Sequence, residues 1–185
     1  MAFRFVPQAI SDVLLIEHDR YADDRGFFTE TGRDDAFAAA GLPHFVQDNH
    51  SRSQRGVLRG LHFQDAPRPL AKVVRCLRGA IFDVAVDIRR GSPTYGRWLG
   101  RELDETQPTM LFLPPGFAHG FCVLSDEADV VYRQSDYYVP ELDRCLRWDD
   151  AEIGIAWPIA APLLSPKDAA APPLATVRNA LTYPR

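Results

Sequence analysis

The stretch AIFDVAVDIR, residues 80–89, carries the clearest structural pattern in this chain. Apolar side chains occupy every even position from Phe82 to Ile88, and the odd positions between them include Asp83 and Asp87. Successive side chains of a β-strand point to opposite faces, so strict alternation is typical of a strand with one face against a core. We therefore predict a half-buried strand here, with both aspartates on the face opposite the apolar side chains.

Similar segments recur along the chain, separated by short joins rich in Gly, Pro and Asp. Further strands are predicted at residues 13–17, 26–31, 46–53, 57–64, 71–78, 97–103, 109–113, 120–124 and 129–136. One short helix fits residues 34–40, with an aspartate to cap it and Gly41 and Pro43 to end it; another is predicted over residues 175–181. Many short strands with almost no helix indicate an all-β sandwich or barrel, for which an antiparallel jelly roll is a natural solution.

The size and composition of the chain are those of an ordinary globular protein. With 185 residues, 46% of them hydrophobic, we expect one domain over residues 1–185, irregular from about residue 148, where Pro and Ala become frequent. The net charge of −4 argues against nucleic-acid binding, which usually needs a basic surface. Because the N-terminus shows no signal-peptide pattern and no long apolar run follows, we expect a cytoplasmic protein that makes no membrane contact.

Neither the cysteines nor the histidines are spaced as metal ligands. The three cysteines are widely separated and form no CxxC pair, which favours free thiols in a reducing compartment. The five histidines form no HxH motif, and no metal is expected. The chain also lacks the GxGxxG, P-loop and GxSxG motifs, so hydride transfer, nucleotide hydrolysis and serine esterase chemistry lose their usual markers.

The segment VLRGLHF, residues 57–63, places an arginine and a histidine on one predicted strand. The period of two puts Gly60 and His62 on one face and Arg59 on the other. If Arg59 and His62 serve one pocket, the strand must twist or bulge, and Gly60 between them would permit this. A lone histidine on a strand is more often structural, so the functional interpretation depends on its neighbours.

Later strands offer side chains that would complete a site for proton transfer. Lys72 heads a strand face that continues with Val74 and Cys76, which fits either a half-buried pocket rim or a solvated strand end. His119 follows a turn and Tyr132 follows two valines, so each also has a structural interpretation. Imidazole, ammonium and phenol groups together suit proton abstraction beside a carbonyl, on an anionic substrate that an arginine anchors.

Eight segments, spread through most of the chain, together resemble one enzyme family. They are DRGFFTE at 24–30, FVQDNHS at 45–51, VLRGLHFQ at 57–64, FDVAVDIR at 82–89, LPPGFAHGF at 113–121, YY at 137–138, RWDD at 147–150 and LSPKD at 164–168. The chain resembles the dTDP-4-dehydrorhamnose 3,5-epimerases, also called dTDP-4-keto-6-deoxyglucose 3,5-epimerases. The resemblance implies a cupin-like antiparallel jelly roll, a homodimer, and activity without a metal or an organic cofactor.

The resemblance also implies a role for each matching side chain. His62 would be the general base, with Asp168 orienting and polarising it and Asp83 as another candidate partner. Tyr132 would be the acid on the opposite face of the sugar ring, and Lys72 would stabilise the enolate oxygen. The remaining matches are expected to contact the nucleotide sugar: Arg25, Phe28, Glu30, Gln47, Asn49, Arg59, His119, Tyr138, Asp143 and Lys167.

Two positions depart from the family pattern without removing a catalytic group. Leu70 stands where many relatives carry glutamine, and Asp143 stands where glutamate is common, so the sugar or nucleotide could be held differently. The expected reaction converts dTDP-4-dehydro-6-deoxy-D-glucose into dTDP-4-dehydro-L-rhamnose, for dTDP-L-rhamnose biosynthesis. Three alternatives stay open: epimerisation of a single carbon, isomerisation of the ketone, or a sugar-nucleotide-binding jelly roll without turnover.

Overall fold

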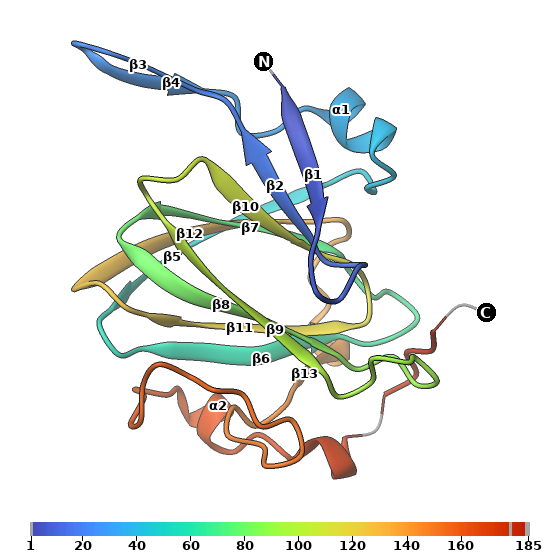
Figure 1. Cartoon of the computed structure of the whole chain (residues 1–185). Helices are drawn as coiled ribbons and strands as arrows, with labels where there is room; N and C mark the ends of the chain where they lie inside the picture. Colours follow the sequence, from blue (N-terminus) through green and yellow to red (C-terminus); the bar gives the residue numbers. More distant parts are fainter. Residues whose placement is uncertain (1, 178, 184–185) are drawn as a thin grey trace.

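Two antiparallel sheets face each other in the computed structural model, which describes residues 2–177 and 179–183 (Figure 1). In spatial order the first sheet contains β1 (Phe3–Pro7), β2 (Leu14–His18), β10 (Thr109–Leu113), β7 (Lys72–Arg78), β12 (Glu127–Gln134) and β5 (Gln47–Gln54). The second contains β13 (Asp143–Cys145), β6 (Leu58–Gln64), β11 (Phe117–Val123), β8 (Ala80–Asp87) and β9 (Trp98–Asp104). Most neighbouring strands are far apart in sequence, as in a jelly roll, so the predicted fold class is confirmed.

The interior between the sheets is filled by apolar side chains from both. Val74 of the six-stranded sheet lies in one buried cluster with Ala85 and Phe121 of the five-stranded sheet. Val73, the next residue along β7, belongs instead to a cluster on the outer face, where α1 (Asp34–Ala39) buries Phe37. The alternation along β7 therefore decides which of its side chains enter the space between the sheets.

The strand β8 is buried on both faces, so the prediction of a half-buried strand is wrong. Its Val84 and Val86 pack in a cluster with Leu146 and Leu174 of the C-terminal segment. That segment runs over the outer face of the five-stranded sheet (Figure 1), and its largely irregular conformation was predicted. Because both faces are covered, Asp83 on the inner face is completely buried.

The helix predicted over residues 175–181 is wrong for the described part of that range. A single 3-10 turn (Leu174–Thr176) forms there, and residue 178 lies outside the described residues. Further on, the chain runs beside Arg90, whose amide donates to the Leu181 carbonyl and whose carbonyl accepts from the Tyr183 amide, each at 3.0 Å. These hydrogen bonds pair the backbone of residues 181–183 with Arg90, as in an extended conformation, instead of with the preceding turn of a helix. Five short elements of the described chain had no sequence prediction: β1, β3 (Arg20–Asp23), the 3-10 turn η1 (Pro140–Leu142), β13 and α2 (Pro166–Ala169).

A hairpin of β3 and β4 (Gly26–Thr29) projects from the body of the molecule (Figure 1). Its tip is closed by hydrogen bonds from the backbone amide and guanidinium of Arg25 to the carboxylate of Asp23. Three aromatic side chains of the hairpin are at least half exposed: Tyr21, Phe27 and Phe28. The hairpin therefore presents apolar surface to solvent.

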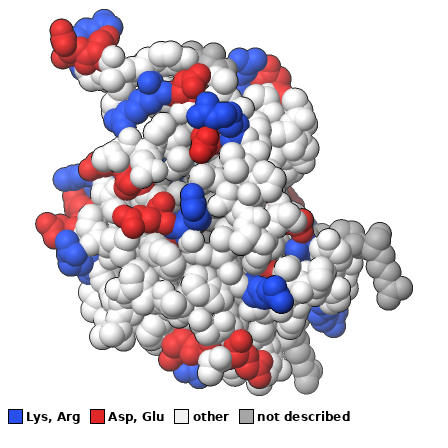
Figure 2. All heavy atoms as spheres, viewed as in Figure 1, with Lys and Arg blue, Asp and Glu red and all other residues white. Residues whose placement is uncertain are grey.

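The outer surface carries charges of both signs. Acidic and basic side chains alternate in small groups over the face shown in Figure 2. Exposed ion pairs form between Arg4 and Glu17 and between Arg55 and Asp126. Among residues 2–177 and 179–183, no helix is long and apolar enough to cross a membrane.

Candidate active site

An irregularity at Gly60 places Arg59 and His62 on the same side of β6. The pairing of β6 with β11 shifts register at this point, so that two residues of β6 oppose one of β11. Gly60 has a φ of +128°, and a Cβ atom there would lie 2.5 Å from the Cα of Gly120, so the site requires glycine. Arg59 and His62 consequently line one pocket, and of the two irregularities that a shared pocket would require, a twist or a bulge, the strand has the bulge.

This pocket lies between the two sheets and takes side chains from both. Arg59 and His62 of β6, with His119 of β11, belong to the five-stranded sheet. Lys72 of β7 and Tyr132 of β12 belong to the six-stranded sheet. The histidine proposed as a base and the phenol proposed as an acid therefore lie on different walls of one cavity.

His62 is held by a carboxylate from a distant part of the chain. Its Nε2 lies 2.6 Å from Oδ1 of Asp168 on α2, whose Oδ2 accepts a hydrogen bond from the hydroxyl of Ser165 at 2.8 Å. Burial alone would raise the pKa of Asp168, but the hydrogen bonds from His62 and Ser165 outweigh it and hold that pKa below its ordinary value. An ionised partner on Nε2 leaves Nδ1 as the free nitrogen of the His62 ring.

Lys72 is almost completely buried, with its ammonium group beside the ring of Tyr132. The Nζ atom lies 5.7 Å from the ring centroid. Burial lowers the pKa of Lys72 to about 8, although the nearby carboxylates of Asp143 and Asp83 favour the charged form. Burial also raises the pKa of the Tyr132 phenol. The wall opposite His62 thus presents a cation close to its pKa and a protonated phenol.

The carboxylate of Asp83 contacts His119 and not His62. Nε2 of His119 lies 2.7 Å from Oδ1 of Asp83, and both side chains are buried. Burial lowers the pKa of His119 more than the Asp83 carboxylate raises it, so the ring is neutral at pH 7. Of the two candidate partners that the resemblance implied for His62, Asp168 is therefore the one in contact with it.

These two histidine–aspartate contacts are isolated pairs rather than parts of a ligand cluster. Across residues 2–177 and 179–183, no three His, Cys, Asp or Glu side chains gather so that they could hold a metal ion. Each of the two pocket histidines is instead engaged by a single carboxylate. The arrangement suits proton transfer and hydrogen bonding.

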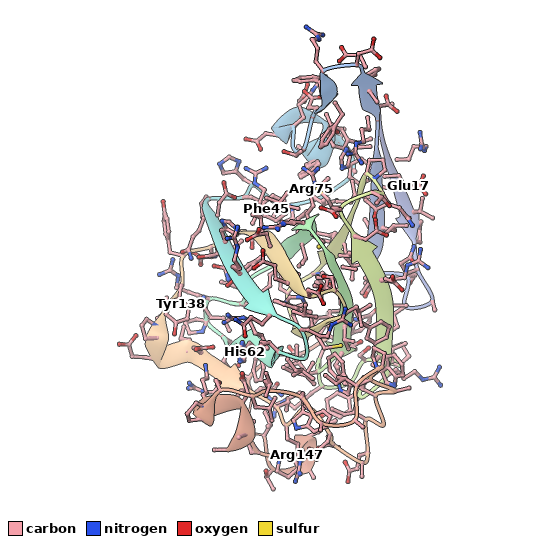
Figure 3. All side chains as sticks on the ribbon, turned by 90° about the vertical axis from the view of Figure 1, so that its left-hand side faces the viewer. Glu17, Phe45, His62, Arg75, Tyr138 and Arg147 are labelled. Atoms are coloured by element: carbon pink, nitrogen blue, oxygen red, sulfur yellow. The ribbon has the colours of Figure 1, made fainter. Side chains whose placement is uncertain are left out.

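Tyr138, Asp143 and Lys167 join at the rim of the pocket, and we call them the rim triad. Oδ2 of Asp143 accepts a hydrogen bond from the Tyr138 hydroxyl at 3.0 Å and another from Nζ of Lys167. Figure 3 shows Tyr138 and His62 on the same side of the molecule. The aspartate at position 143 is therefore long enough to connect both partners.

Gln47 and Asn49 form a chain of amides beside the pocket. Nε2 of Gln47 donates to Oδ1 of Asn49 at 3.1 Å, and Nδ2 of Asn49 donates to Oε1 of Gln134 at 3.1 Å. Oε1 of Gln47 accepts a hydrogen bond from the backbone amide of Tyr138 at 3.0 Å. The amide of Gln47 is thus engaged with the protein, and the side chain supports the rim.

Two glutamines without a predicted role also line the pocket. Gln64 and Gln134 are each 5% exposed and lie two residues beyond His62 and Tyr132. The strand period of two contained this signal, because a residue two positions from a pocket side chain faces the same way.

Arg25, Phe28 and Glu30 lie away from this pocket. Arg25 and Phe28 are exposed on the projecting hairpin, and Glu30 follows it directly. None of the three is among the residues that line the cavity containing His62. A single chain therefore does not bring these three predicted contacts to the site.

In this jelly roll, a histidine–aspartate pair lies across the pocket from a lysine and a tyrosine. This fold and this set of side chains indicate a sugar-nucleotide epimerase. Comparison with known proteins supports this class, because residues 7–176 match the family model described as dTDP-4-dehydrorhamnose 3,5-epimerase. The chain belongs to the dTDP-4-dehydrorhamnose 3,5-epimerase family. The family resemblance found in the sequence is thereby confirmed.

Individual relatives match over most of their length. The dTDP-4-dehydrorhamnose 3,5-epimerase of Pseudomonas aeruginosa is 53% identical over 163 residues, which cover 86% of this chain and 90% of that protein. The crystal structure of a dTDP-6-deoxy-D-glucose-3,5-epimerase from Legionella pneumophila, in complex with dTDP-4-keto-L-rhamnose, matches with a TM-score of 0.96, 42% identity and full coverage of both chains. A dTDP-4-dehydrorhamnose 3-epimerase of Streptomyces niveus is 45% identical over 98% of this chain and 88% of that protein.

Proposed function

We propose that this chain epimerises carbons 3 and 5 of a dTDP-4-keto-6-deoxyhexose, converting dTDP-4-dehydro-6-deoxy-D-glucose into dTDP-4-dehydro-L-rhamnose. One observation carries the proposal: His62, backed by Asp168, lies across a cavity from Tyr132. An epimerase must remove a proton from one face of a carbon and return a proton to the other. A base and an acid on different walls suit that requirement.

His62 takes the proton from the carbon next to the ketone. Its Nε2–H donates to Asp168, so Nδ1 accepts the proton and the carboxylate stabilises the imidazolium that forms. The electron pair of the broken C–H bond moves into an enolate, whose oxygen gains negative charge. Lys72 is cationic below its pKa of about 8 and, because its side chain is buried, stabilises this oxygen with little screening by water.

Tyr132 returns a proton from the other wall. Burial raises the pKa of its phenol, so the group holds its proton at neutral pH. When the phenol protonates the carbon, the enolate reverts to the ketone and the configuration of that carbon is inverted. The tyrosinate left behind lies close to the cations of Lys72 and Arg59, which stabilise it until it regains a proton.

Arg59 is the proposed anchor for the diphosphate. Its Nε donates to the hydroxyl of Ser53 at 2.9 Å, which orients the guanidinium at the pocket. Guanidinium groups bind phosphate oxygens through paired N–H donors. The neutral ring of His119, with Nε2 turned to Asp83, offers Nδ1 as an acceptor for a sugar hydroxyl. Binding energy from these groups positions the reacting carbons.

Deuterium incorporation from solvent tests this proposal and separates it from the alternatives. Product formed in deuterated water should carry one deuterium at carbon 3 and one at carbon 5. Deuterium at a single carbon would indicate a single-carbon epimerase, the activity named for the Streptomyces niveus relative. A product with a moved ketone would indicate an isomerase, and dTDP-sugar binding without product would indicate a binding protein.

We infer that the reaction needs neither a metal ion nor an organic cofactor. The positive charge that an enolate requires is available from Lys72, and both proton-transfer groups are side chains of the chain itself. Activity should therefore survive exhaustive treatment with EDTA followed by gel filtration. Loss of activity that Zn²⁺ or Mg²⁺ restores would contradict this inference. We also place the enzyme in the cytoplasm, where its three free cysteines would stay reduced.

We further propose a homodimer in which the hairpin of one subunit completes the pocket of the other. Arg25 and Phe28 match residues with which the family contacts the sugar nucleotide, yet both lie away from the pocket of their own chain. The exposed aromatic side chains of the hairpin would be covered by a second copy. A hollow beside the hairpin, on the outer face of the six-stranded sheet, is a candidate binding surface for the second copy. Its lining residues include Gly32, Arg75, Met110 and Arg133.

A further inference from the structure

The loop that carries Tyr138 is held by side-chain amides from both sheets. It follows β12 of the six-stranded sheet and leads to β13 of the five-stranded sheet. Oε1 of Gln64 on β6 accepts from the Val139 amide at 2.8 Å, and its Nε2 donates to the Tyr137 carbonyl at 3.2 Å. Gln47 on β5 accepts from the Tyr138 amide at 3.0 Å. Three consecutive residues of the loop therefore bond to two glutamines on facing sheets.

Gln64 has its amide group turned to the backbone rather than to a ligand. Its Nε2 also donates to the carbonyl of Arg68 at 2.6 Å, so both of its N–H donors are used. The oxygen is engaged by the Val139 amide, and only 5% of the residue is exposed. Although it lines the pocket, Gln64 therefore acts on the loop more than on a bound sugar.

The loop in turn positions the rim triad. The backbone amides of Tyr138 and Val139 are both held by glutamine side chains. From this fixed backbone the Tyr138 hydroxyl donates a hydrogen bond to Asp143, which also accepts one from Lys167. The pocket below this rim contains His62 and Lys72. A shift of the backbone at residues 137–139 would therefore move the Tyr138 hydroxyl away from its partner without moving the proton-transfer groups on the strands.

We propose that Gln64 is a positioning residue for epimerisation, which fixes residues 137–139 so that the rim triad closes over the bound sugar nucleotide. The inference rests on the proposed function for its substrate. It assigns Gln64 a role in holding that substrate, apart from the proton transfer at His62. Loss of an interaction that is equal in the ground state and the transition state raises KM and leaves kcat nearly unchanged.

The substitution Gln64→Met tests this role, because methionine has a similar length and makes no strong hydrogen bond. We expect KM for the 4-keto sugar nucleotide to rise roughly tenfold while kcat stays within about threefold. Gln64→Glu keeps an oxygen for the Val139 amide and should recover part of the affinity. An unchanged KM, or a fall in kcat alone, overturns the inference. If Gln64→Met does not fold, Gln64→Glu carries the test, and a wild-type KM in that variant overturns it.

Ser135→Ala is the matched control for loss of stability. The hydroxyl of Ser135 accepts from the Ala71 amide at 2.8 Å, so its removal also leaves a backbone group without its partner, but outside residues 137–139. Its KM should equal that of the wild type. A double-mutant cycle with Tyr138→Phe adds a second criterion. Because Gln64 acts through Tyr138, the two effects on KM should overlap, and full additivity overturns the inference.

Amide hydrogen exchange separates this inference from the proposed function, because it needs no substrate. The amides of Tyr138 and Val139 should exchange faster in Gln64→Met than in the wild type, and in Ser135→Ala they should not. Unchanged exchange in Gln64→Met overturns the role of Gln64. Faster exchange together with a wild-type chain that shows no turnover supports the role of Gln64 in the loop and refutes the proposed function instead.

Discussion

The carboxylate of Asp168 lies 2.6 Å from Nε2 of His62, although the two residues are 106 positions apart in the chain. Only 3% of the Asp168 side chain is exposed, so water competes little for this hydrogen bond. Ser165 holds the second carboxylate oxygen and thereby fixes the direction of the first. The pair therefore has one defined geometry before any substrate binds.

Asp168→Asn should lower kcat by about 10²-fold or more, because the amide cannot stabilise the imidazolium of His62 as a carboxylate does. The rate of solvent deuterium entry into the substrate should fall in parallel. Asp126→Asn is the control, since Asp126 is exposed and pairs only with Arg55 among the described residues. A kcat for Asp168→Asn within about threefold of the control would show that His62 works without its partner.

The decrease of kcat/KM at alkaline pH, the alkaline limb of the pH profile, should reflect deprotonation of Lys72. Its pKa of about 8 means that the ammonium form dominates below that pH and is lost above it, so kcat/KM should fall above pH 8. Burial raises the pKa of the Tyr132 phenol, so this group does not titrate in the same range. In Lys72→Arg the residual activity should show no limb near pH 8, because guanidinium stays charged. A limb that persists in Lys72→Arg would assign it to another group.

Asp143→Asn should move that limb to lower pH. The carboxylate of Asp143 favours the ammonium form of Lys72, and its neutralisation also leaves Lys167 without its partner, which disfavours a second cation nearby. Tyr138→Phe is the control, because it removes a contact to Asp143 and keeps the charge. An unshifted limb in Asp143→Asn, with a wild-type profile in the control, would mean that Asp143 does not influence the titrating group.

Gly60→Ala should destabilise the fold more than an equally strained substitution elsewhere. A Cβ at Gly60 would overlap the backbone of Gly120, so we expect a loss of roughly 2–4 kcal/mol in the free energy of unfolding. Gly26 has the same φ of +128° but no atom within 4 Å of the added carbon, so Gly26→Ala carries the backbone strain alone. Urea unfolding of both variants checks this, and equal losses would contradict the close approach at Gly60.

Hybrid dimers should show whether the hairpin serves the partner subunit. His62→Ala and Arg25→Ala chains should each have little activity alone. When the two are unfolded together and refolded, random pairing should restore roughly one quarter of the wild-type rate, because one pocket in each mixed dimer then has both residues. No recovery, in a mixture that forms dimers, would mean that Arg25 serves its own chain or none.

Strand alternation predicted the parts of the site that lie within one strand. The face shared by Lys72 and Val74 does enter the space between the sheets, and Gly60 does mark the bulge. Alternation could not show which aspartate meets which histidine, because that depends on the sheet order. Asp83 is placed beside His119 by the pairing of β8 with β11, and only the family resemblance pointed to Asp168.

The burial of β8 on both faces could not be predicted from the sequence of the strand itself. Its outer face is covered by an irregular segment that shows no hydrophobic periodicity and includes Leu146 and Leu174. The strand period places Gln64 on the same face as His62, but its contact with residues 137–139 could not be predicted, because its partners there are backbone groups of a loop. The hairpin residues were matched by family pattern, and their distance from the pocket appears only in three dimensions.

The docking of the C-terminal segment has a consequence for the timing of activity during synthesis. A ribosome releases both sheets up to β12 before it releases α2, so His62 is present in a nearly complete barrel while Asp168 is still being made. Until that helix settles on the outer face of the five-stranded sheet, the histidine has no carboxylate to share its proton. On the proposed roles of His62 and Asp168, full turnover therefore requires a chain whose C-terminal segment has docked.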